Sequence, residues 1–298
     1  MANSPPTTRS LSETEAVLKA VGELTRLRLL HLCAHGEHSV GDLVDILGQS
    51  QPRVSRHLKI LCDAGLLERF RDGHFVYFRM PLSGAGAALA KQFVAMTDQN
   101  DQMRVDDHQR MLSLLEEAQS TTADPAFRQL NRLVLDQFIS HPVGDLLDIG
   151  VGSGAILQLL AGRANHAVGI DIDANARRNT RRAFAAHTLA NCTIRDGDMN
   201  DLRFSDDSFD TVVLDEILLS SDNPSQTIDE AVRVLRPSGR LLLIEQCAEA
   251  EQQTVATRMA ALCAEAGLRC GVIRQCFYHD TKFLVTSAES SQPKRKRA

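Results

Sequence analysis

The sequence predicts an α/β protein with two domains, a mainly helical one followed by one with a mostly parallel sheet. With 298 residues the chain is long enough for two cores, because single domains usually have roughly 100–200 residues. Apolar residues recur at helical spacing near the start, whereas strands and helices alternate beyond residue 140. The composition, 43% hydrophobic and 24% charged, is typical of folded proteins and excludes collagen, coiled-coil rods and wholesale disorder.

Membrane and secretion signals are not evident in the sequence. No apolar stretch approaches the roughly 18 residues that span a bilayer, and the first residues lack a basic region followed by an apolar one. We therefore expect a cytoplasmic protein without a membrane partner. The seven cysteines are scattered and never form a Cys-x-x-Cys pair, which argues against a disulfide framework and a zinc ribbon. Most of them are expected to be small buried hydrophobic residues.

The net charge of −5 is distributed unevenly along the chain. Residues 1–82 contain ten Lys and Arg and nine Asp and Glu, whereas residues 83–298 contain 23 and 29. Within Gly48–Arg79 six basic residues accompany three acidic ones. A local basic face of this kind can bind phosphates even when the whole protein is acidic, although an ordinary solvated surface would show the same charge.

Four helices are predicted in the first 64 residues from apolar spacing and from start and stop signals. Ser39 is expected to cap the third helix, and Ser50 is expected to cap the fourth after a tight turn at Gly48. The fourth helix has an apolar side and a basic polar side, as in a helix-turn-helix whose second helix enters the DNA major groove. The four predicted helices are Glu13–Gly22, Leu24–His35, Val40–Leu47 and Gln51–Ala64.

A hairpin is predicted directly after these helices. Leu66–Phe70 and Phe75–Met80 have strand character, and the Asp72-Gly73 pair between them favours a tight turn. In a helix-turn-helix domain such a hairpin is the wing.

The N-terminal domain resembles the winged-helix regulators of the arsenical-resistance repressor family. The resemblance rests on Ser50-Gln51-Pro52-Arg53-Val54-Ser55-Arg56-His57-Leu58, with Leu24–Leu30, Ser39–Leu43 and Ala64–Leu67 around it, and covers about residues 12–82. It implies a homodimer that binds palindromic, double-stranded operator DNA. Arg56 or His57 could instead brace the helix or contact only phosphate. The DNA-binding residues carried over are Gln51, Arg53, Ser55, Arg56, His57 and Lys59, with Arg71 and His74 from the wing.

The metal ligands of that family are not matched in this sequence. Ser39-Val40-Gly41 stands where arsenic- and lead-sensing members have Cys-Val-Cys. Zinc-sensing members have Asp-x-His and a second His in their last helix. Here Asp106 and His108 match the first half, but Gln119 replaces the second His, and a tetrahedral site would lack ligands. We therefore expect no metal and interpret His108 as an exposed helix residue.

The chain is expected to contain four parts: residues 1–82, the winged helix-turn-helix domain; 83–124, dimerisation helix and linker; 125–288, the second domain; and 289–298, a disordered basic tail. Ala87–Glu117 is interpreted as the dimerisation helix or helices, and Ser120–Pro125 as the boundary. The tail residues Pro293–Arg297 resemble a nuclear import signal, but a solvated tail with non-specific DNA affinity is preferred, since the head is of a bacterial type.

A glycine-rich turn opens the second domain. Leu146–Ile149 predicts a strand, Gly150, Gly152 and Gly154 form the turn, and Ala155–Ala161 predicts a helix. The spacing differs from the dinucleotide-binding pattern, in which the third glycine would fall one position later, so a smaller adenosyl ligand is favoured. Asp171 lies 21 residues after Gly150, at the end of the next strand, where it can accept hydrogen bonds from both ribose hydroxyls.

Residues 125–288 resemble class I methyltransferases that use S-adenosylmethionine. Asp207-Ser208-Phe209-Asp210 and Arg233-Val234-Leu235-Arg236-Pro237-Ser238-Gly239 carry this resemblance, with Ser238 in place of the first of two glycines. It implies a Rossmann-like, mostly parallel seven-stranded sheet and S-adenosylmethionine or S-adenosylhomocysteine as the ligand. Asp171 would hold the ribose, Asp198 the adenine amino group, and Met199 would flank the ring. The full set of ligand-binding residues is Asp148, Gly150, Gly152, Gly154, Asp171, Ile172, Asp198, Met199 and Asp215.

Two functions remain open at this point. The architecture resembles regulators of methionine-cycle genes that respond to S-adenosylhomocysteine, which favours a repressor with the demethylated ligand as effector. The alternative is an active small-molecule methyltransferase whose head regulates its own gene. Asp215 and Glu216 could act as a base, with Tyr278 and His279 as distant candidates, but no acceptor-activating residue is identifiable. Carboxylates near the ligand would favour the cationic sulfonium.

Overall fold

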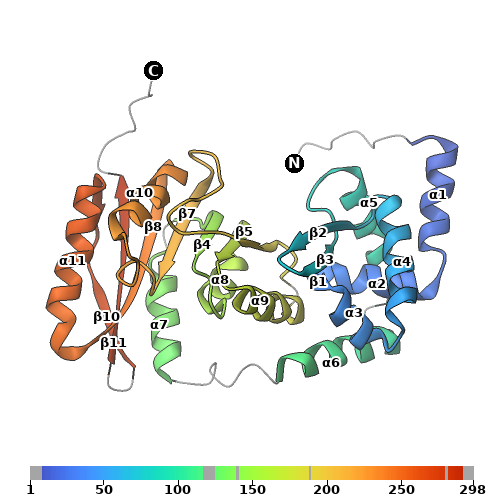
Figure 1. Ribbon diagram of the computed structural model, residues 1–298, viewed down its shortest axis with the longest axis horizontal. Helices are drawn as coiled ribbons and strands as arrows, with labels where there is room; N and C mark the ends of the chain where they lie inside the picture. Colours follow the sequence, from blue (N-terminus) through green and yellow to red (C-terminus); the bar gives the residue numbers. More distant parts are fainter. Residues whose placement is uncertain are drawn as a thin grey trace. The chain divides into compact units, whose positions relative to one another are not determined.

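The computed structural model describes residues 9–98, 100–116, 125–138, 141–187, 189–278 and 281–290 (Figure 1). The chain divides into two units. Unit 1 contains Met1–Ala118 with Arg181–Ala190, and unit 2 contains Gln119–Thr180 with Asn191–Ala298. Most of the predicted boundary segment, Gln119, His279 and the basic tail from residue 291 onward lie outside the described residues. In the described ranges no helix is long and apolar enough to cross a membrane.

The helices predicted from Leu24, Val40 and Gln51 begin at those residues, whereas the first helix begins at Leu11, two residues earlier than predicted. The predicted segment Ala87–Glu117 forms two helices, which begin at Gly84 and Gln102. Ser39 accepts a hydrogen bond from the Asp42 backbone, and Asp42 caps Ser39 in return. Ser50 is the N-cap of the next helix, but its side chain makes no capping hydrogen bond, so the predicted cap was wrong in that respect. The helices are α1 (Leu11–Val21), α2 (Leu24–His35), α3 (Val40–Leu47), α4 (Gln51–Asp63), α5 (Gly84–Ala95) and α6 (Gln102–Glu116).

A three-stranded antiparallel sheet completes the winged helix, in the order β1-β3-β2. Strands β2 (Glu68–Asp72) and β3 (Phe75–Arg79) form the predicted hairpin, joined by Gly73 and His74. The first strand of the hairpin begins two residues later than predicted, because Leu66 and Leu67 are buried in the core instead. Strand β1 (His38–Ser39) has two residues and was not predicted.

The core of unit 1 holds α4 in place from its apolar side. Val54, Leu58 and Leu61 are each 0% exposed. Burying three such side chains contributes roughly 1.5–3 kcal/mol each, so the orientation of α4 is strongly determined. At the start of α5, a Cβ on Gly86 would lie 2.2 Å from the Gly65 carbonyl oxygen, so the backbone approach there requires glycine.

Unit 2 alternates strands and helices, as predicted. The strands are β4 (Gly144–Ile149), β5 (Ala164–Asp171), β6 (Cys192–Asp196), β7 (Phe209–Asp215), β8 (Leu235–Ala248), β9 (Leu268–Cys270), β10 (Arg274–Tyr278) and β11 (Thr281–Ser290). The helices are α7 (Pro125–Asp136), α8 (Ala155–Ala161), α9 (Ala174–Ala186, of which residues 181–186 belong to unit 1), α10 (Pro224–Val234), the short η1 (Glu249–Glu251) and α11 (Gln252–Glu265).

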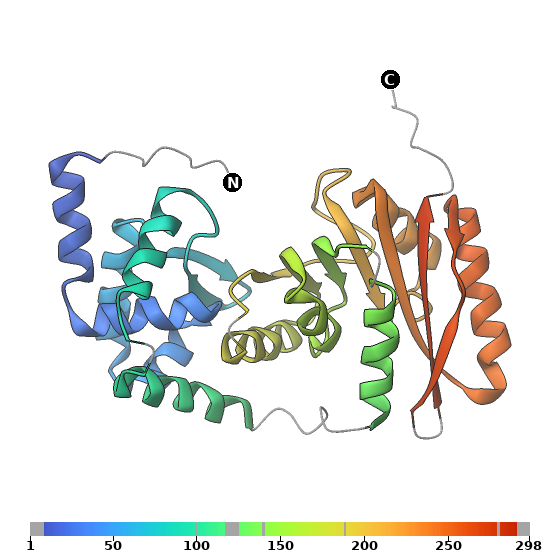
Figure 2. The ribbon, with the colours of Figure 1, turned by 180° about the vertical axis from the view of Figure 1, so that it is seen from behind.

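The strand order in unit 2 is β10-β11-β8-β7-β4-β5-β6, with β9 paired to β11. The pairs among β4 to β8 are parallel, and the three pairs that involve β11 are antiparallel. The mostly parallel seven-stranded sheet is therefore confirmed, with β9 as an addition. Figure 2 shows α11 alongside the antiparallel edge. Because β4 lies between β5 and β7, the sheet has a topological switch point at the carboxyl end of β4, where ligands bind in this architecture.

Strand β8 contains an irregularity near its start. It begins at Leu235, and its pairing with β7 shifts between Phe209 and Thr211, so residues 236–239 form a bulge. Arg236 ties this bulge to Asp210 at 2.5 Å and to Asp145 at 2.9 Å.

The cysteines match the expectation that most are buried. Cys33, Cys192, Cys247, Cys263 and Cys276 are buried, and Cys62 and Cys270 are half-buried. All seven are free thiols.

Candidate functional sites

The polar face of α4 carries five of the predicted DNA-binding residues, all with exposed side chains: Gln51, Arg53, Ser55, Arg56 and Lys59. Lys59 also forms an exposed ion pair of 2.6 Å with Asp63, one turn later. Such pairs contribute little, so Lys59 can exchange Asp63 for a phosphate at small cost. The exposed cations of α4 thus form a surface that can approach DNA from one side.

His57 differs from its neighbours on α4 because its ring lies against Glu23 and Arg26, at the start of α2. The side chain is 13% exposed, and Nδ1 lies 3.5 Å from the Glu23 carboxylate and 3.5 Å from the Arg26 guanidinium. Burial, followed by the nearby cations of Arg26, Arg53 and Arg56, lowers the pKa of His57, although Glu23 opposes this. These contacts support the alternative that His57 braces the helix.

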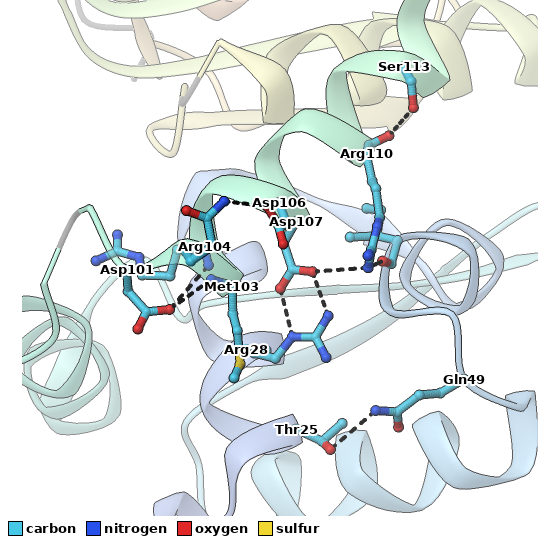
Figure 3. Close-up of polar contacts among 12 residues, drawn as sticks. Thr25, Arg28, Gln49, Asp101, Met103, Arg104, Asp106, Asp107, Arg110 and Ser113 are labelled. Carbon is cyan, nitrogen blue, oxygen red and sulfur yellow. Dashed lines mark hydrogen bonds and ion pairs between the residues drawn. The ribbon is translucent and has the colours of Figure 1, made fainter.

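The turn that precedes α4 is fixed from within unit 1. Gly48 has a φ of 63°, which a glycine adopts readily. The Gln49 amide donates to the Thr25 hydroxyl of α2 at 3.3 Å, as Figure 3 shows. In the wing, Arg71 and His74 are exposed, as a role in DNA contact requires.

An ion pair between α2 and α6 was not foreseen from the sequence. Arg28 donates from Nε to Asp107 Oδ2 at 2.8 Å and from Nη2 to Oδ1 at 2.5 Å (Figure 3). The Asp107 side chain is 4% exposed, and Arg110 lies 3.8 Å from the same carboxylate. The hydrogen bonds with Asp107 and its charge outweigh the effect of burial and raise the pKa of Arg28. This bidentate ion pair fixes α6, part of the predicted dimerisation segment, to α2, the helix that supports α4.

A cavity of about 730 Å³ lies between α2 and α6, and its lining includes His31, His35 and His108. Burial lowers the pKa values of His31 and His35 to about 4, so both rings are neutral at physiological pH. His108 is half-buried and lies 5.9 Å from the His35 ring, which corrects the expectation that it is exposed. Across the described residues no group of three or more His, Cys, Asp or Glu is arranged to hold a metal ion.

The glycine turn of unit 2 has the backbone that the sequence predicted. Gly150, Gly152 and Gly154 have φ values of 71°, 48° and 76°, all in the left-handed region. A Cβ on Gly152 would have Gly150 O as its nearest neighbour, at 3.8 Å, so the backbone there is open to an approaching ligand. On Gly150 a Cβ would instead lie 2.6 Å from the Ile217 side chain.

Asp171 fastens this turn from the neighbouring strand. Its carboxylate accepts from Gly152 N at 2.9 Å and from Asp173 N at 2.8 Å. The Thr180 hydroxyl donates to Gly152 O at 2.8 Å. Each carboxylate oxygen has a second lone pair, so Asp171 retains acceptor capacity for ribose hydroxyls while it holds the turn.

Carboxylates gather at the carboxyl ends of β4, β7 and β8. Asp148 is 1% exposed, and burial, Asp215 and Asp171 raise its pKa well above the usual range. Burial, Glu216 and Glu245 raise the pKa of Asp215 to about 7. Burial raises the pKa of Glu245 to about 7, although the Leu219 backbone donates to its Oε1 at 3.1 Å.

The remaining predicted ligand residues lie beyond the ends of β5 and β6. Ile172 is 76% exposed, which is high for a large apolar side chain and is compatible with contact to a flat ring. Asp198 accepts from Asn200 N at 2.8 Å, and Met199 is partly buried against the core. Glu245 was missed by the sequence reasoning, although it follows the apolar run Leu241–Ile244 and lies beside the end of β7, where ligand-binding residues are expected.

Comparison with known families gives two matches in separate parts of the chain. A model described as "Bacterial regulatory protein, arsR family" matches residues 24–69. A model described as "Methyltransferase domain" matches residues 147–243.

Individual relatives match the same two parts. The transcriptional repressor SdpR of Bacillus subtilis (strain 168) is 34% identical over 64 residues, which cover 22% of this chain and 71% of SdpR. The demethylmenaquinone methyltransferase of Clavibacter sepedonicus is 31% identical over 118 residues, which cover 39% of this chain. The matched residues make up 47% of that methyltransferase, so the chain spans less than half of its length.

A solved structure shares the fold of the second part. The N-methyltransferase NodS from Bradyrhizobium japonicum WM9, in complex with S-adenosyl-l-homocysteine, has a TM-score of 0.51 and 19% sequence identity. The likeness covers 61% of this chain and 99% of NodS. At this level of identity the likeness shows the fold of an S-adenosylmethionine-dependent methyltransferase and not the activity.

Proposed function

Since the chain belongs to the arsR family and joins that repressor domain to a methyltransferase domain, we propose that it is a transcriptional repressor with an adenosyl effector. The effector is S-adenosylhomocysteine or S-adenosylmethionine, bound at the glycine turn of unit 2. The protein acts as a homodimer on a palindromic operator in the cytoplasm. The observation that carries the proposal is the open backbone at Gly152 beside Asp171, on a chain whose α4 presents exposed cations.

The operator is bound by α4 and the wing. Arg53 and Arg56 are exposed and uncommitted to ion pairs in the described structure, so they can reach base edges or phosphates in the major groove. Gln51 and Ser55 add hydrogen-bonding groups on the same helix. Arg71 and His74 of the wing contact the neighbouring sugar-phosphate backbone of the DNA. The dimer places two such helices about one helical turn of DNA apart.

The residues of unit 2 fit an adenosyl ligand by their chemistry. Asp171 supplies an anionic acceptor for ribose hydroxyls, and the glycine backbone admits the methionine part. Ile172 and Met199 supply apolar surface for the adenine ring, and Asp198 an acceptor for its amino group. The orphaned oxygens of Asp148 and Asp215 are acceptors for a cationic group such as the ligand's α-ammonium.

The proposal is tested by measuring operator and ligand binding together. Fluorescence anisotropy with the protein's own promoter is recorded with and without each adenosyl ligand. If a ligand changes the affinity for the operator by a given factor, the operator must change the affinity for that ligand by the same factor. Typical couplings of about 1–3 kcal/mol correspond to changes of roughly 5- to 150-fold. An operator affinity that stays unchanged at saturating concentrations of each ligand would contradict the effector role.

A second function is favoured by one observation. Asp215, with a pKa of about 7, lies beside Glu216 at the end of β7, and a carboxylate of this kind can act as a general base near neutral pH. The protein would then be a small-molecule methyltransferase with an autoregulatory head. Release of S-adenosylhomocysteine from S-adenosylmethionine in the presence of candidate acceptors distinguishes this function from a pure sensor.

A further inference from the structure

Four carboxylates converge where β4 and β7 end beside β8, which continues to Ala248. Asp148 in β4 is paired with Val213 of β7, and Asp215 in β7 is paired with Ile244 of β8. Asp215 is therefore followed by Glu216, and Ile244 by Glu245, at the same edge of the sheet. This edge adjoins the glycine turn, because Gly150 directly follows β4.

These carboxylates lack an ion-pair partner among the described residues, although the charge of Arg258 in α11 acts on Glu245. In the described part of the chain none of the four forms an ion pair with Lys or Arg, and one oxygen each of Asp148 and Asp215 has no hydrogen-bond partner. Asp148 is only 1% exposed, so its orphaned oxygen cannot be satisfied by bulk water. A buried acceptor without a partner, in a cluster of like charges, indicates that a positively charged group binds from outside.

The two forms of the proposed ligand differ in the charge that they bring to this edge. Both carry an α-ammonium, but the methylated form adds a sulfonium where the demethylated form has a neutral thioether. We infer that Asp215 and Glu245 select the charge of the ligand and favour the sulfonium over the thioether. The inference rests on the proposed adenosyl ligand, and it opposes the expectation from family resemblance that the demethylated form is preferred.

Asp215 and Glu245 are assigned this selection because they ionise near neutral pH. Deep burial, followed by the neighbours Asp215 and Asp171, raises the pKa of Asp148 well above its usual range. Asp215 and Glu245 each have a pKa of about 7, raised first by burial. Glu216 faces both of them, and Arg258 of α11 is the cation that acts on Glu245. At pH 6 the pair is largely neutral, whereas at pH 8.5 it is charged and attracts a cation.

Calorimetry on the full chain tests the inference. S-adenosylmethionine and S-adenosylhomocysteine are titrated at pH 6 and pH 8.5, and at each pH the Kd of S-adenosylhomocysteine is divided by the Kd of S-adenosylmethionine. We expect S-adenosylmethionine to bind more tightly at pH 8.5, with a ratio about tenfold larger than at pH 6. Equal ratios at the two pH values overturn the inference while leaving the adenosyl site intact. Absence of binding by both ligands overturns the proposed function as well.

Amide variants test whether Asp215 and Glu245 cause the pH-dependent preference for S-adenosylmethionine. Asp215→Asn and Glu245→Gln keep the side-chain shape, and each should lower the ratio at pH 8.5 by about threefold and flatten its pH dependence. The matched control is Glu249→Gln, an exposed carboxylate shortly after the same strand, which should leave the ratio unchanged. If one amide variant fails to fold, the other variant and the wild-type ratios still decide. Wild-type ratios in both amide variants would show that other groups select the ligand.

Discussion

Arg28 and Asp107, which are 79 residues apart in sequence, form a bidentate ion pair. Its two hydrogen bonds measure 2.8 Å from Nε to Oδ2 and 2.5 Å from Nη2 to Oδ1. Their contact joins α2, which packs against α4, to α6, which lies in the segment that the sequence predicts to dimerise. It thereby links the operator surface to the proposed dimer surface within unit 1.

Removal of one partner of this pair should destabilise unit 1. Asp107→Ala leaves the Arg28 guanidinium, 17% exposed, without its carboxylate, and we expect a loss of about 3 kcal/mol in the free energy of unfolding. Asp106→Asn is the matched control, because Asp106 is next in sequence and accepts from Gln102 at the helix surface. Urea unfolding followed by circular dichroism measures both variants. Equal midpoints for Asp107→Ala and wild type would show that the pair contributes nothing.

Arg53→Ala and Arg56→Ala should weaken operator binding. Loss of a base contact costs roughly 1–3 kcal/mol, and loss of a phosphate contact lowers the salt slope by about one. Anisotropy titrations at two salt concentrations separate these effects. Lys19→Ala serves as control, since Lys19 is an exposed cation on α1 that pairs with Glu15. Unchanged affinity in both Arg variants would move the operator surface away from α4.

Asp171→Asn should weaken binding of adenosyl ligands. The charged acceptor for the ribose hydroxyls is lost, at a cost of roughly 1.5–3 kcal/mol, and the hydrogen bond that fastens Gly152 is weakened. Calorimetry measures the change, and Asp222→Asn, an exposed carboxylate before α10, is the control. Operator binding without ligand should be retained in Asp171→Asn. An undiminished ligand affinity would argue against a ribose site at Asp171.

Asp215→Asn should stabilise the unliganded protein at high pH. The pKa of Asp215 is raised from its ordinary value to about 7, so the folded state holds a proton that the unfolded state has released between about pH 4 and pH 7. The contribution of Asp215 to stability therefore falls as the pH rises through this window and is constant above it. We expect the variant to gain about 1–3 kcal/mol over wild type at pH 8 and little at pH 4. Thermal unfolding at both pH values checks this difference.

The sequence predicted the elements of this protein better than its long-range contacts. Helices α2 and α3 begin and end where local caps and glycines indicated, because those signals act within a few residues. The pair Arg28–Asp107 leaves no local pattern, since its partners meet only when α6 folds back on α2. Strand β1 has two residues, too few for an alternating pattern, and exists because β3 pairs with it.

The candidate sites show the same division between local and distant information. The glycine turn and Asp171 were found because their spacing is a motif in itself. Glu245 was missed because an acidic residue after a strand is ordinary, and its significance depends on Asp215 beside it. His57 carries a DNA-binding motif position, yet its ring faces Glu23 and Arg26, which only the packing of α1, α2 and α4 determines.

Strand β11 is the last strand along the chain, yet it pairs with β8, β9 and β10 inside the sheet. During synthesis the N-terminal helices leave the ribosome early and can fold first, whereas the sheet lacks one of its interior strands until residue 290 has been made. A nascent or prematurely terminated chain would therefore have a folded operator-binding domain before its ligand pocket is complete. Under the proposed function, the protein can occupy its promoter before it is able to sense the metabolite that should control it.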